Sequence, residues 1–239
     1  EIKILVRSIN DGAELLRETQ KRVREGLSSC LVTRISDASS TLFGEGIKND
    51  KKKYFEGLDE LAQKAANENK SFISVIEKES FFFEAITPPR CLIIIGAVHI
   101  AQALAPMAMI IGFKVVVIDP RKSFATSERF PGVDIRTDWP DQVITDLSVN
   151  NRTAIVVLTH DPKIDDQVLR SSLESPSFYV GALGSSRTNE KRLNRLKDLG
   201  LDKSALNRLH GPVGLDIGSK LPAEIAIAIL AEIIQEIRR

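Results

Sequence analysis

The sequence is poor in cysteine, with only Cys30 and Cys91 among its 239 residues. Both cysteines lie in apolar, strand-like runs, whereas metal sites in proteins usually present paired ligands at short spacing. We therefore expect two buried structural thiols and no metal site.

Long apolar runs and an excess of charge are also absent. No run reaches the ~18 to 20 apolar residues that span a bilayer, and the opening EIKILVRSIND lacks a signal-peptide pattern. Lys and Arg total 33 against 32 for Asp and Glu, a formal net charge of +1. We expect a soluble, cytoplasmic protein whose partners include neither nucleic acid nor membrane.

Common catalytic signatures are missing too. The chain has no G-x-S-x-G elbow, no H-E-x-x-H, no P-loop lysine and no Cys-His pairing. A binding protein therefore competes seriously with an enzyme, and we assign no catalytic residue.

The first part of the chain mixes helix and strand patterns, which indicates a small α+β domain over residues 1–87. The Pro88-Pro89 pair can continue neither a helix nor a central strand, so we expect a domain boundary there. The predicted elements are a helix over 10–26, a strand over 28–36, a loop over 37–53, a helix over 55–69, and strands over 71–76 and 80–86.

Residues 88–239 follow a regular pattern of apolar strands that alternate with helical segments. The strands are CLIIIG at 91–96, KVVVID at 114–119, TAIVVLT at 153–159 and SFYVGAL at 177–183, with a weaker one, VDIRT, at 133–137. Such alternation indicates a Rossmann-like, doubly wound parallel sheet, the α/β class, whose ligands lie beyond the carboxyl ends of the strands.

The first candidate site is the turn in IIIGAVHIAQAL, residues 93–104. Gly96 ends a strand just before a helix, but Val98 stands where the G-x-G-x-x-G fingerprint has its second glycine. Asp119 follows Gly96 by 23 residues, close to the ~20 expected for a ribose-binding carboxylate, and Arg121 could hold a phosphate. The alternatives are a structural joint and a surface ion pair between Asp119 and Arg121.

A second candidate, LTHDPKIDD, places His160 and Asp161 after the strand at 153–159. Acid, base and cation meet there at one strand end, although capping of the following helix also explains a carboxylate.

A third candidate is VGALGSSRTNEKRLNRL, in which Gly184, Ser185, Ser186 and Arg187 precede a helix. Amides, hydroxyls and a cation at a helix start form a phosphate cradle, and an ordinary N-capped helix is the alternative.

The fourth candidate is a glycine-proline loop that contains His210, Gly211 and Asp216. It is too irregular for secondary structure and too apolar for a disordered linker, so we expect it to be ordered for a reason. The apolar helix that follows, from Pro222 to Ile237, is expected to be core or a dimer face.

Taken in order, GAVHIAQALAP, GFKVVVIDPR, FATSERFPG, DWPDQ, VVLTHDP, FYVGALGSSRT and LHGPVGLDIGSKLPAEIA resemble the Rossmann-like half of the XdhC/CoxI family, the xanthine dehydrogenase accessory factors. The resemblance implies a maturation factor that binds molybdenum cofactor (molybdopterin), protects it while a cysteine desulfurase supplies sulfur, and inserts it into a molybdenum hydroxylase such as xanthine dehydrogenase. It also implies a homodimer.

The residues that match the family's turns are Gly96, Ala97, Val98, His99, Asp119, Gly184, Ser185 and Arg187. Adding the other loops gives a candidate cofactor site that also includes Arg121, His160, Asp161, Ser186, His210, Gly211 and Asp216. Val98 disfavours the usual pyrophosphate seat of NAD(P), so an NAD(P)-binding oxidoreductase is one alternative and a ligand-free scaffold between desulfurase and dehydrogenase is another. The cysteine-bearing glycine stretch expected in the family's N-terminal domain is absent, which implies a reduced or incomplete domain.

Overall fold

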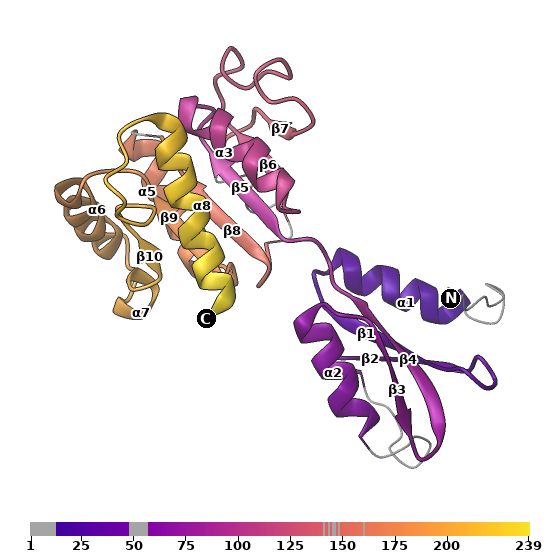
Figure 1. Cartoon of the computed structure of the whole chain (residues 1–239). Coiled ribbons are helices and arrows are strands. Elements are labelled where there is room, and N and C mark those ends of the chain that lie inside the picture. The colour runs from indigo at the N-terminus through magenta and orange to yellow at the C-terminus, as the bar shows by residue number, and fades with distance from the viewer. Residues whose placement is uncertain are drawn as a thin grey trace. The chain divides into compact units, whose positions relative to one another are not determined.

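The computed structural model describes residues 13–47, 57–140, 142, 144, 147, 149–159 and 161–239. The chain divides between Pro88 and Pro89 into two compact units (Figure 1). In the part of the chain so described, no helix is both long and apolar enough to cross a membrane.

The N-terminal unit is an antiparallel sheet in the order β2-β1-β4-β3, packed against the helix α2. Its elements are α1 (Ala13–Arg24), β1 (Ser29–Arg34), β2 (Ser40–Gly44), α2 (Leu58–Glu68), β3 (Phe72–Ile76) and β4 (Glu79–Ile86). The small α+β region is confirmed.

One sequence-based expectation in this unit is wrong. Part of the loop predicted over 37–53 is the strand β2, which pairs antiparallel with β1. Leu42 and Phe43 are buried there, and Ala38 adopts a left-handed φ of 57° that closes the hairpin. The polar residues around this short apolar pair conceal the strand in the sequence.

The C-terminal unit is a six-stranded parallel sheet in the order β10-β9-β8-β5-β6-β7, which confirms the Rossmann-like α/β class. Its elements are β5 (Cys91–Ile95), α3 (His99–Ile110), β6 (Lys114–Ile118), β7 (Asp134–Arg136), β8 (Thr153–Val157), α5 (Pro162–Glu174), β9 (Tyr179–Ala182), α6 (Ser186–Asp198), α7 (Lys203–Leu206), β10 (Leu209–His210) and α8 (Pro222–Arg238). The strand order reverses at β5, where open α/β sheets bind ligands.

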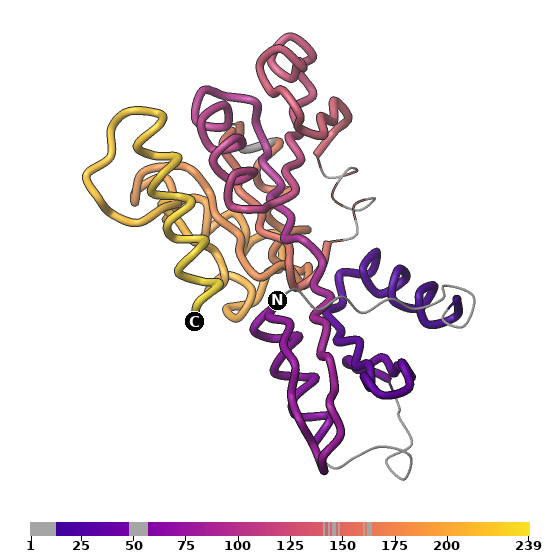
Figure 2. The backbone as a smooth tube through the Cα atoms, turned by 45° about the vertical axis from the view of Figure 1, so that its right-hand side comes forward, coloured from indigo at the N-terminus to yellow at the C-terminus, as the bar shows by residue number. Residues whose placement is uncertain are grey.

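Helices cover both faces of this sheet (Figures 1 and 2). On one face, α3 and α8 lie side by side over side chains such as Leu92 and Val156. On the other, α5 and α6 cover Ile93 and Ile155. Because both faces are buried, the strands are almost continuously apolar, and the pattern is readable from sequence.

The glycine-proline loop starts with more regular structure than its sequence indicates. Leu209 and His210 form the edge strand β10, which pairs parallel with β9. The expectation of no secondary structure from His210 onward is therefore wrong at its first residue.

The two thiols differ in burial. Cys30 is fully buried, as expected, and Cys91 is half-buried. Burial raises the pKa of Cys30 to about 12 and that of Cys91 to about 11. Both side chains therefore remain neutral thiols at physiological pH, poor as nucleophiles and as metal ligands.

Candidate functional site

The turn after β5 lies where the strand order of the sheet reverses. Gly96 has a left-handed φ of 105°, and its N–H donates to the carbonyl of Ile118 at 2.8 Å. A Cβ at Gly96 would lie 2.8 Å from Cγ2 of Thr159, which follows β8. The close approach of the two loops therefore requires glycine here.

The residues after Gly96 form the start of α3. Val98 occupies the N-cap position, and no side-chain hydrogen bond caps the helix. The Val98 side chain is half-buried and packs against the cluster beneath α3 and α8, whereas His99 is exposed. The first turn of α3 therefore receives no acceptor from its cap, and its amides suit an anion.

Asp119 is buried at the end of β6, with 1% of its surface exposed. Its carboxylate accepts hydrogen bonds from the Ala97 N–H at 2.8 Å, and from the N–H, Nε and Nη2 of Arg121 at 3.0, 2.9 and 2.7 Å. Burial acts to raise the pKa of Asp119, but these bonds outweigh it and hold the pKa below its ordinary value. A ribose hydroxyl would have to share oxygens already engaged.

A second buried charged cluster lies at the ends of β8 and β9, and sequence reasoning missed it. Thr159 donates a hydrogen bond to the carboxylate of Asp165, and Nη2 of Arg192 lies 3.7 Å from the other Asp165 oxygen. The same Nη2 donates to the carbonyl of Leu183 at 2.8 Å. Asp165 and Arg192 are each only 2% exposed.

Arg192 is not fully satisfied by these partners. Its Nε and Nη1 are buried and have no hydrogen-bond partner among the described residues. Burial lowers the pKa of Arg192, and the nearby Asp165 opposes this effect. A Cβ at Gly184 would lie 3.5 Å from Nη1. The glycine turn after β9 therefore covers a buried guanidinium with unused donors.

The Gly184 turn also contains the helix cap that the sequence left open as an alternative. Ser185 is the N-cap of α6, and its Oγ accepts from the Thr188 N–H at 3.2 Å. Ser186 and Arg187 are exposed in the first turn. A capped helix and an anion cradle can coexist, because the cap uses one first-turn amide.

The candidate after β8 is described only in part. His160 lies outside the described residues. Asp161 is exposed, and its backbone carbonyl accepts from the N–H groups of Ile164 and Asp165 at 3.0 and 2.9 Å. Asp161 therefore stands at the start of α5, as the capping alternative proposed.

His210 points to α8 instead of standing alone. Its Nδ1 lies 3.0 Å from Oε1 of Glu232, and its ring stacks on Tyr179 at a centroid distance of 4.4 Å. Oε2 of Glu232 accepts from the Tyr179 hydroxyl at 2.5 Å and from the Gly214 N–H at 2.7 Å. Burial acts to raise the pKa of Glu232, but the bonds from His210, Tyr179 and Gly214 hold it below its ordinary value.

The rest of this loop runs beside the Gly184 turn. Asn189 of α6 donates to the carbonyl of Gly211 at 2.7 Å, and the Val213 N–H donates to the carbonyl of Ala182 at 3.1 Å. Asp216 lies further along, exposed, and accepts from the Gly218 N–H at 3.4 Å. Gly211 thus belongs to the strand-end row, whereas His210 fastens the loop to α8.

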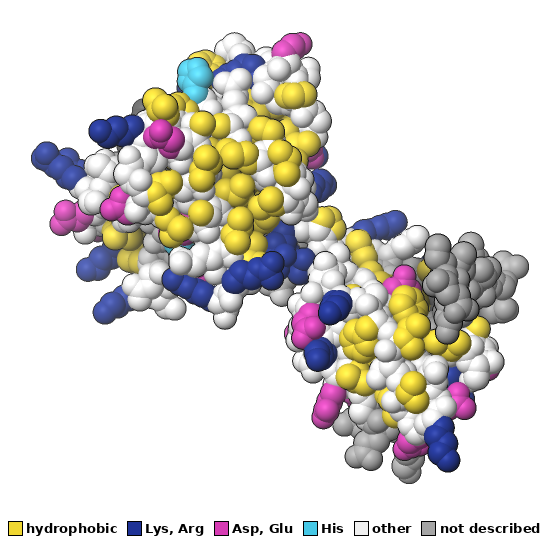
Figure 3. Space-filling view, in the orientation of Figure 1, with side chains coloured by type: hydrophobic (Ala, Val, Ile, Leu, Met, Phe, Trp, Pro, Cys, Tyr) yellow, Lys and Arg dark blue, Asp and Glu magenta, His cyan; other side chains and the backbone are white. Residues whose placement is uncertain are grey.

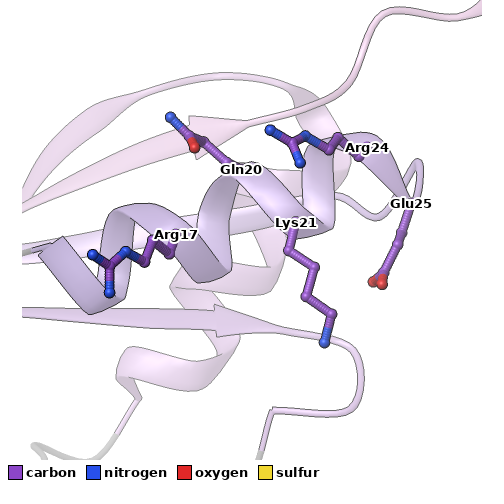
Figure 4. A pocket seen from close by; sticks show the side chains of 5 residues that line it. All are labelled: Arg17, Gln20, Lys21, Arg24 and Glu25. Carbon is purple, nitrogen blue, oxygen red and sulfur yellow. The ribbon is translucent and has the colours of Figure 1, made fainter.

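The described contacts therefore join the strand ends in one row. It runs from Arg121 and Asp119 through Ala97, Gly96, Thr159, Asp165 and Arg192 to the Gly184 and Gly211 turns. The N-terminal unit has a separate feature, a hollow on the exposed side of α1 lined by Arg17, Gln20, Lys21, Arg24 and Glu25 (Figure 4). These side chains are not part of the strand-end row.

Comparison with known proteins places this architecture. The model of the XdhC Rossmann domain matches residues 92–233, more than half of the chain. The chain belongs to the XdhC family. The resemblance seen in the sequence is thereby confirmed.

Individual XdhC-related proteins match parts of the chain. A Bacillus subtilis protein, named as one of the probable subunits of xanthine dehydrogenase, is 35% identical over 161 residues, 67% of this chain and 47% of that protein. The molybdenum cofactor insertion chaperone PaoD of Escherichia coli is 34% identical over 85 residues, 36% of this chain and 27% of PaoD. The chain thus spans about half, or less, of the length of these relatives.

A solved XdhC-like structure matches most of the chain. The crystal structure described as a xanthine dehydrogenase from Bacillus halodurans has a TM-score of 0.66 and 26% sequence identity, and the match covers 94% of this chain and 67% of that one. This share is larger than the Rossmann unit alone, so the N-terminal unit has a counterpart as well.

In this XdhC chain, the missed residues did leave a signal in the sequence. Arg192 and Leu196 are the buried residues of α6, and Asp165 lies on the stripe of α5 that continues with Val168 and Leu169. Charged residues at i, i+3 and i+4 positions of an apolar stripe indicate a buried pair.

Proposed function

We propose that this chain binds molybdenum cofactor at the carboxyl ends of β5, β6, β8 and β9 and assists its insertion into a xanthine dehydrogenase-type molybdenum hydroxylase. The names of two relatives support the role, since one is called a molybdenum cofactor insertion chaperone and the other is named as part of a xanthine dehydrogenase. Shelter of the cofactor while a cysteine desulfurase supplies sulfur is part of the same proposal.

The single observation that carries the proposal is the buried Arg192 beneath the Gly184 turn. A ligand with a terminal phosphate needs fixed donors and a positive charge, and Arg192 has two buried nitrogens without partners. Glycine at position 184 keeps this turn free of a side chain, since a Cβ there would approach Thr188 at 3.2 Å and Nη1 of Arg192 at 3.5 Å. The residues present therefore fit a phosphate-bearing ligand.

The chain's own residues would divide the work as follows. The first-turn amides of α6, with Ser186 and Arg187, would hold the phosphate over Arg192. The wall from Gly96 to His99 would flank the pterin, with Arg121 at the β6 end. The bound cofactor carries the molybdenum and dithiolene chemistry to the target enzyme, while the protein binds, orients and shelters it from water.

The alternative function is NAD(P)-dependent oxidoreduction, and the position of Asp119 at the end of β6 favours it. Against it, Asp119 already accepts bonds from Ala97 and Arg121. A scaffold that binds no ligand would leave Arg192 without a purpose at the strand ends.

We propose that the chain is a homodimer, as the family resemblance implies, and that α3 and α8 supply the face. Exposed apolar side chains gather on these helices (Figure 3), among them Met109, Ile110, Ile227 and Ile234. Sedimentation of Ile227→Lys/Ile234→Lys against the parent chain tests this, and a parent chain that sediments as a monomer at all accessible concentrations would contradict it.

The test of function is anaerobic titration of purified protein with molybdenum cofactor, separated from free cofactor by gel filtration. We expect near-stoichiometric binding, weakened about tenfold or more by Gly184→Asp and by Arg187→Ala. Arg170→Gln, which removes a guanidinium from an exposed ion pair on α5, is the matched control and should bind as the parent does. Absence of binding by folded parent protein would refute the proposal.

A further inference from the structure

Arg121, Phe124 and Arg129 form an exposed cation-aromatic cluster beyond the end of β6, here called the arginine shelf. The Arg121 guanidinium carbon lies 4.3 Å from the centroid of the Phe124 ring, and that of Arg129 lies 5.3 Å from it. Phe124 is 39% exposed, which is unusual for a phenylalanine held between two cations.

The shelf is fixed from behind by groups that do not belong to it. Nε and Nη2 of Arg121 are held by the buried carboxylate of Asp119, which leaves Nη1 unengaged by Asp119. Nη2 of Arg129 donates to Oε1 of Gln102 on α3 at 2.9 Å, and its Nη1 donates to the Phe124 carbonyl at 2.7 Å. The guanidinium planes are therefore held in place before any ligand arrives.

The charges of the shelf are only partly balanced. Asp119 neutralises Arg121, but both hydrogen-bond partners of Arg129 are neutral, and Arg129 forms no salt bridge within the part of the chain that the structure describes. Two guanidinium groups near one ring repel each other, so an anion bound beside them would be stabilised. The ring and the guanidinium planes also suit stacking of a flat heteroaromatic group.

From this geometry we infer that the arginine shelf binds a nucleoside monophosphate group, with its base stacked on Phe124 and Arg121 and its phosphate on Arg129 and Nη1 of Arg121. The inference rests on the proposed function, because it makes the cargo a nucleotide-extended form of the pterin cofactor. The same chemistry occurs in the phosphorylated adenosine of NADP, so the test has to separate the two sources. An acidic peptide would match the charge but not the exposed ring.

Isothermal titration calorimetry of the full chain with GMP, CMP and adenosine 2′,5′-bisphosphate tests the inference, with guanosine and inorganic phosphate as partial ligands. We expect saturable binding of at least one nucleotide and roughly tenfold weaker binding of both partial ligands. Tightest binding of GMP or CMP assigns a pterin dinucleotide, and tightest binding of the bisphosphate assigns NADP. No saturable binding of any nucleotide, or binding only of a polyglutamate peptide, overturns the inference.

Variants locate the binding on the shelf. Phe124→Leu and Arg129→Gln should each weaken nucleotide binding roughly three- to tenfold, whereas Arg170→Gln should leave it unchanged. Circular dichroism and thermal melting check that each variant folds. Equal nucleotide affinity in all three variants contradicts the shelf as the site.

The inference and the proposed function fail separately. Phe124→Leu should still bind nucleotide-free molybdopterin as the parent chain does. A parent chain that binds molybdopterin but no nucleotide refutes the shelf alone. A parent chain that binds nucleotides through Phe124 but no molybdopterin refutes the proposed function and keeps the shelf.

Discussion

The backbone N–H of Ala97 donates a 2.8 Å hydrogen bond to Oδ2 of Asp119, and so joins the glycine turn after β5 to the end of β6. The carboxylate that the sequence suggested for a ribose thus has a structural partner inside the protein. The same carboxylate fixes Arg121 at the edge of the sheet. A Rossmann-like fold here presents a cation where a nicotinamide enzyme usually presents an acid.

Gly96→Ala should destabilise the C-terminal unit through both backbone and contact. The left-handed φ of 105° costs a non-glycine residue about 1–2 kcal/mol, and the clash with Cγ2 of Thr159 adds about 1–3 kcal/mol. Gly112→Ala is the matched control, because its φ is 90° and nothing lies within 4 Å. Urea unfolding measures both variants, and equal losses would show that the contact with Thr159 is harmless.

Arg192→Met should lower the free energy of unfolding by about 3–5 kcal/mol, because it leaves the buried Asp165 carboxylate without its cation. Adding Asp165→Asn should recover at least about 1 kcal/mol, since the second change removes the stranded charge. A double-mutant cycle by chemical denaturation measures this coupling. Strict additivity would mean that the two side chains are energetically independent.

Glu232→Gln should destabilise the protein by about 1–3 kcal/mol, because one carboxylate holds Tyr179, His210 and Gly214 together. The expected fall in melting temperature is about 2–4 °C per kcal/mol for a chain of this size. Glu174→Gln, in an exposed pair with Arg170, should stay within about 0.5 kcal/mol of the parent. A melting temperature unchanged in Glu232→Gln would contradict the assigned bonds.

The stabilising effect of Glu232 should depend on pH. Its pKa in the folded protein lies below the ordinary value of 4.5, so its contribution is fully present above that value and is lost as the pH falls through the folded pKa. The difference in stability between the parent and Glu232→Gln should therefore be constant from about pH 7 to 5.5 and shrink below about pH 4.5. Urea titrations across this range measure it, and a gap that stays constant down to pH 3 would be inconsistent with a lowered pKa.

The thiols should react slowly in the native protein. Burial raises the pKa values of Cys30 and Cys91 to about 12 and 11, so few thiolates form at pH 8. With a chromogenic disulfide reagent, we expect Cys91 to react before Cys30, and both to react rapidly in guanidinium chloride. Rapid native reaction of Cys30 would mean that β1 opens readily.

The alternation of strands and helices after Pro89 could be predicted from the sequence because strands buried on both faces are continuously apolar. The strands from Cys91–Ile95 to Tyr179–Ala182 follow this rule. The strand Ser40–Gly44 escaped because only Leu42 and Phe43 are buried in it. A short edge strand in a polar setting leaves almost no periodic pattern.

The candidate site was predictable only where a motif stands at a strand end. The Gly96 and Gly184 turns are such motifs, and their geometry matches the close approaches that glycine allows. Asp165 and Arg192 have no motif, because their pairing depends on two helices, α5 and α6, that meet only in the folded sheet. The bond between His210 and Glu232 likewise joins residues 22 positions apart through tertiary packing.

The most direct test of the central claim is native mass spectrometry of the chain, purified anaerobically from cells that make molybdenum cofactor. We predict an added mass of about one pterin cofactor per chain, and its loss in Gly184→Asp but not in Arg170→Gln. A folded parent chain that carries only a nicotinamide nucleotide, or nothing after exposure to excess cofactor, would contradict it.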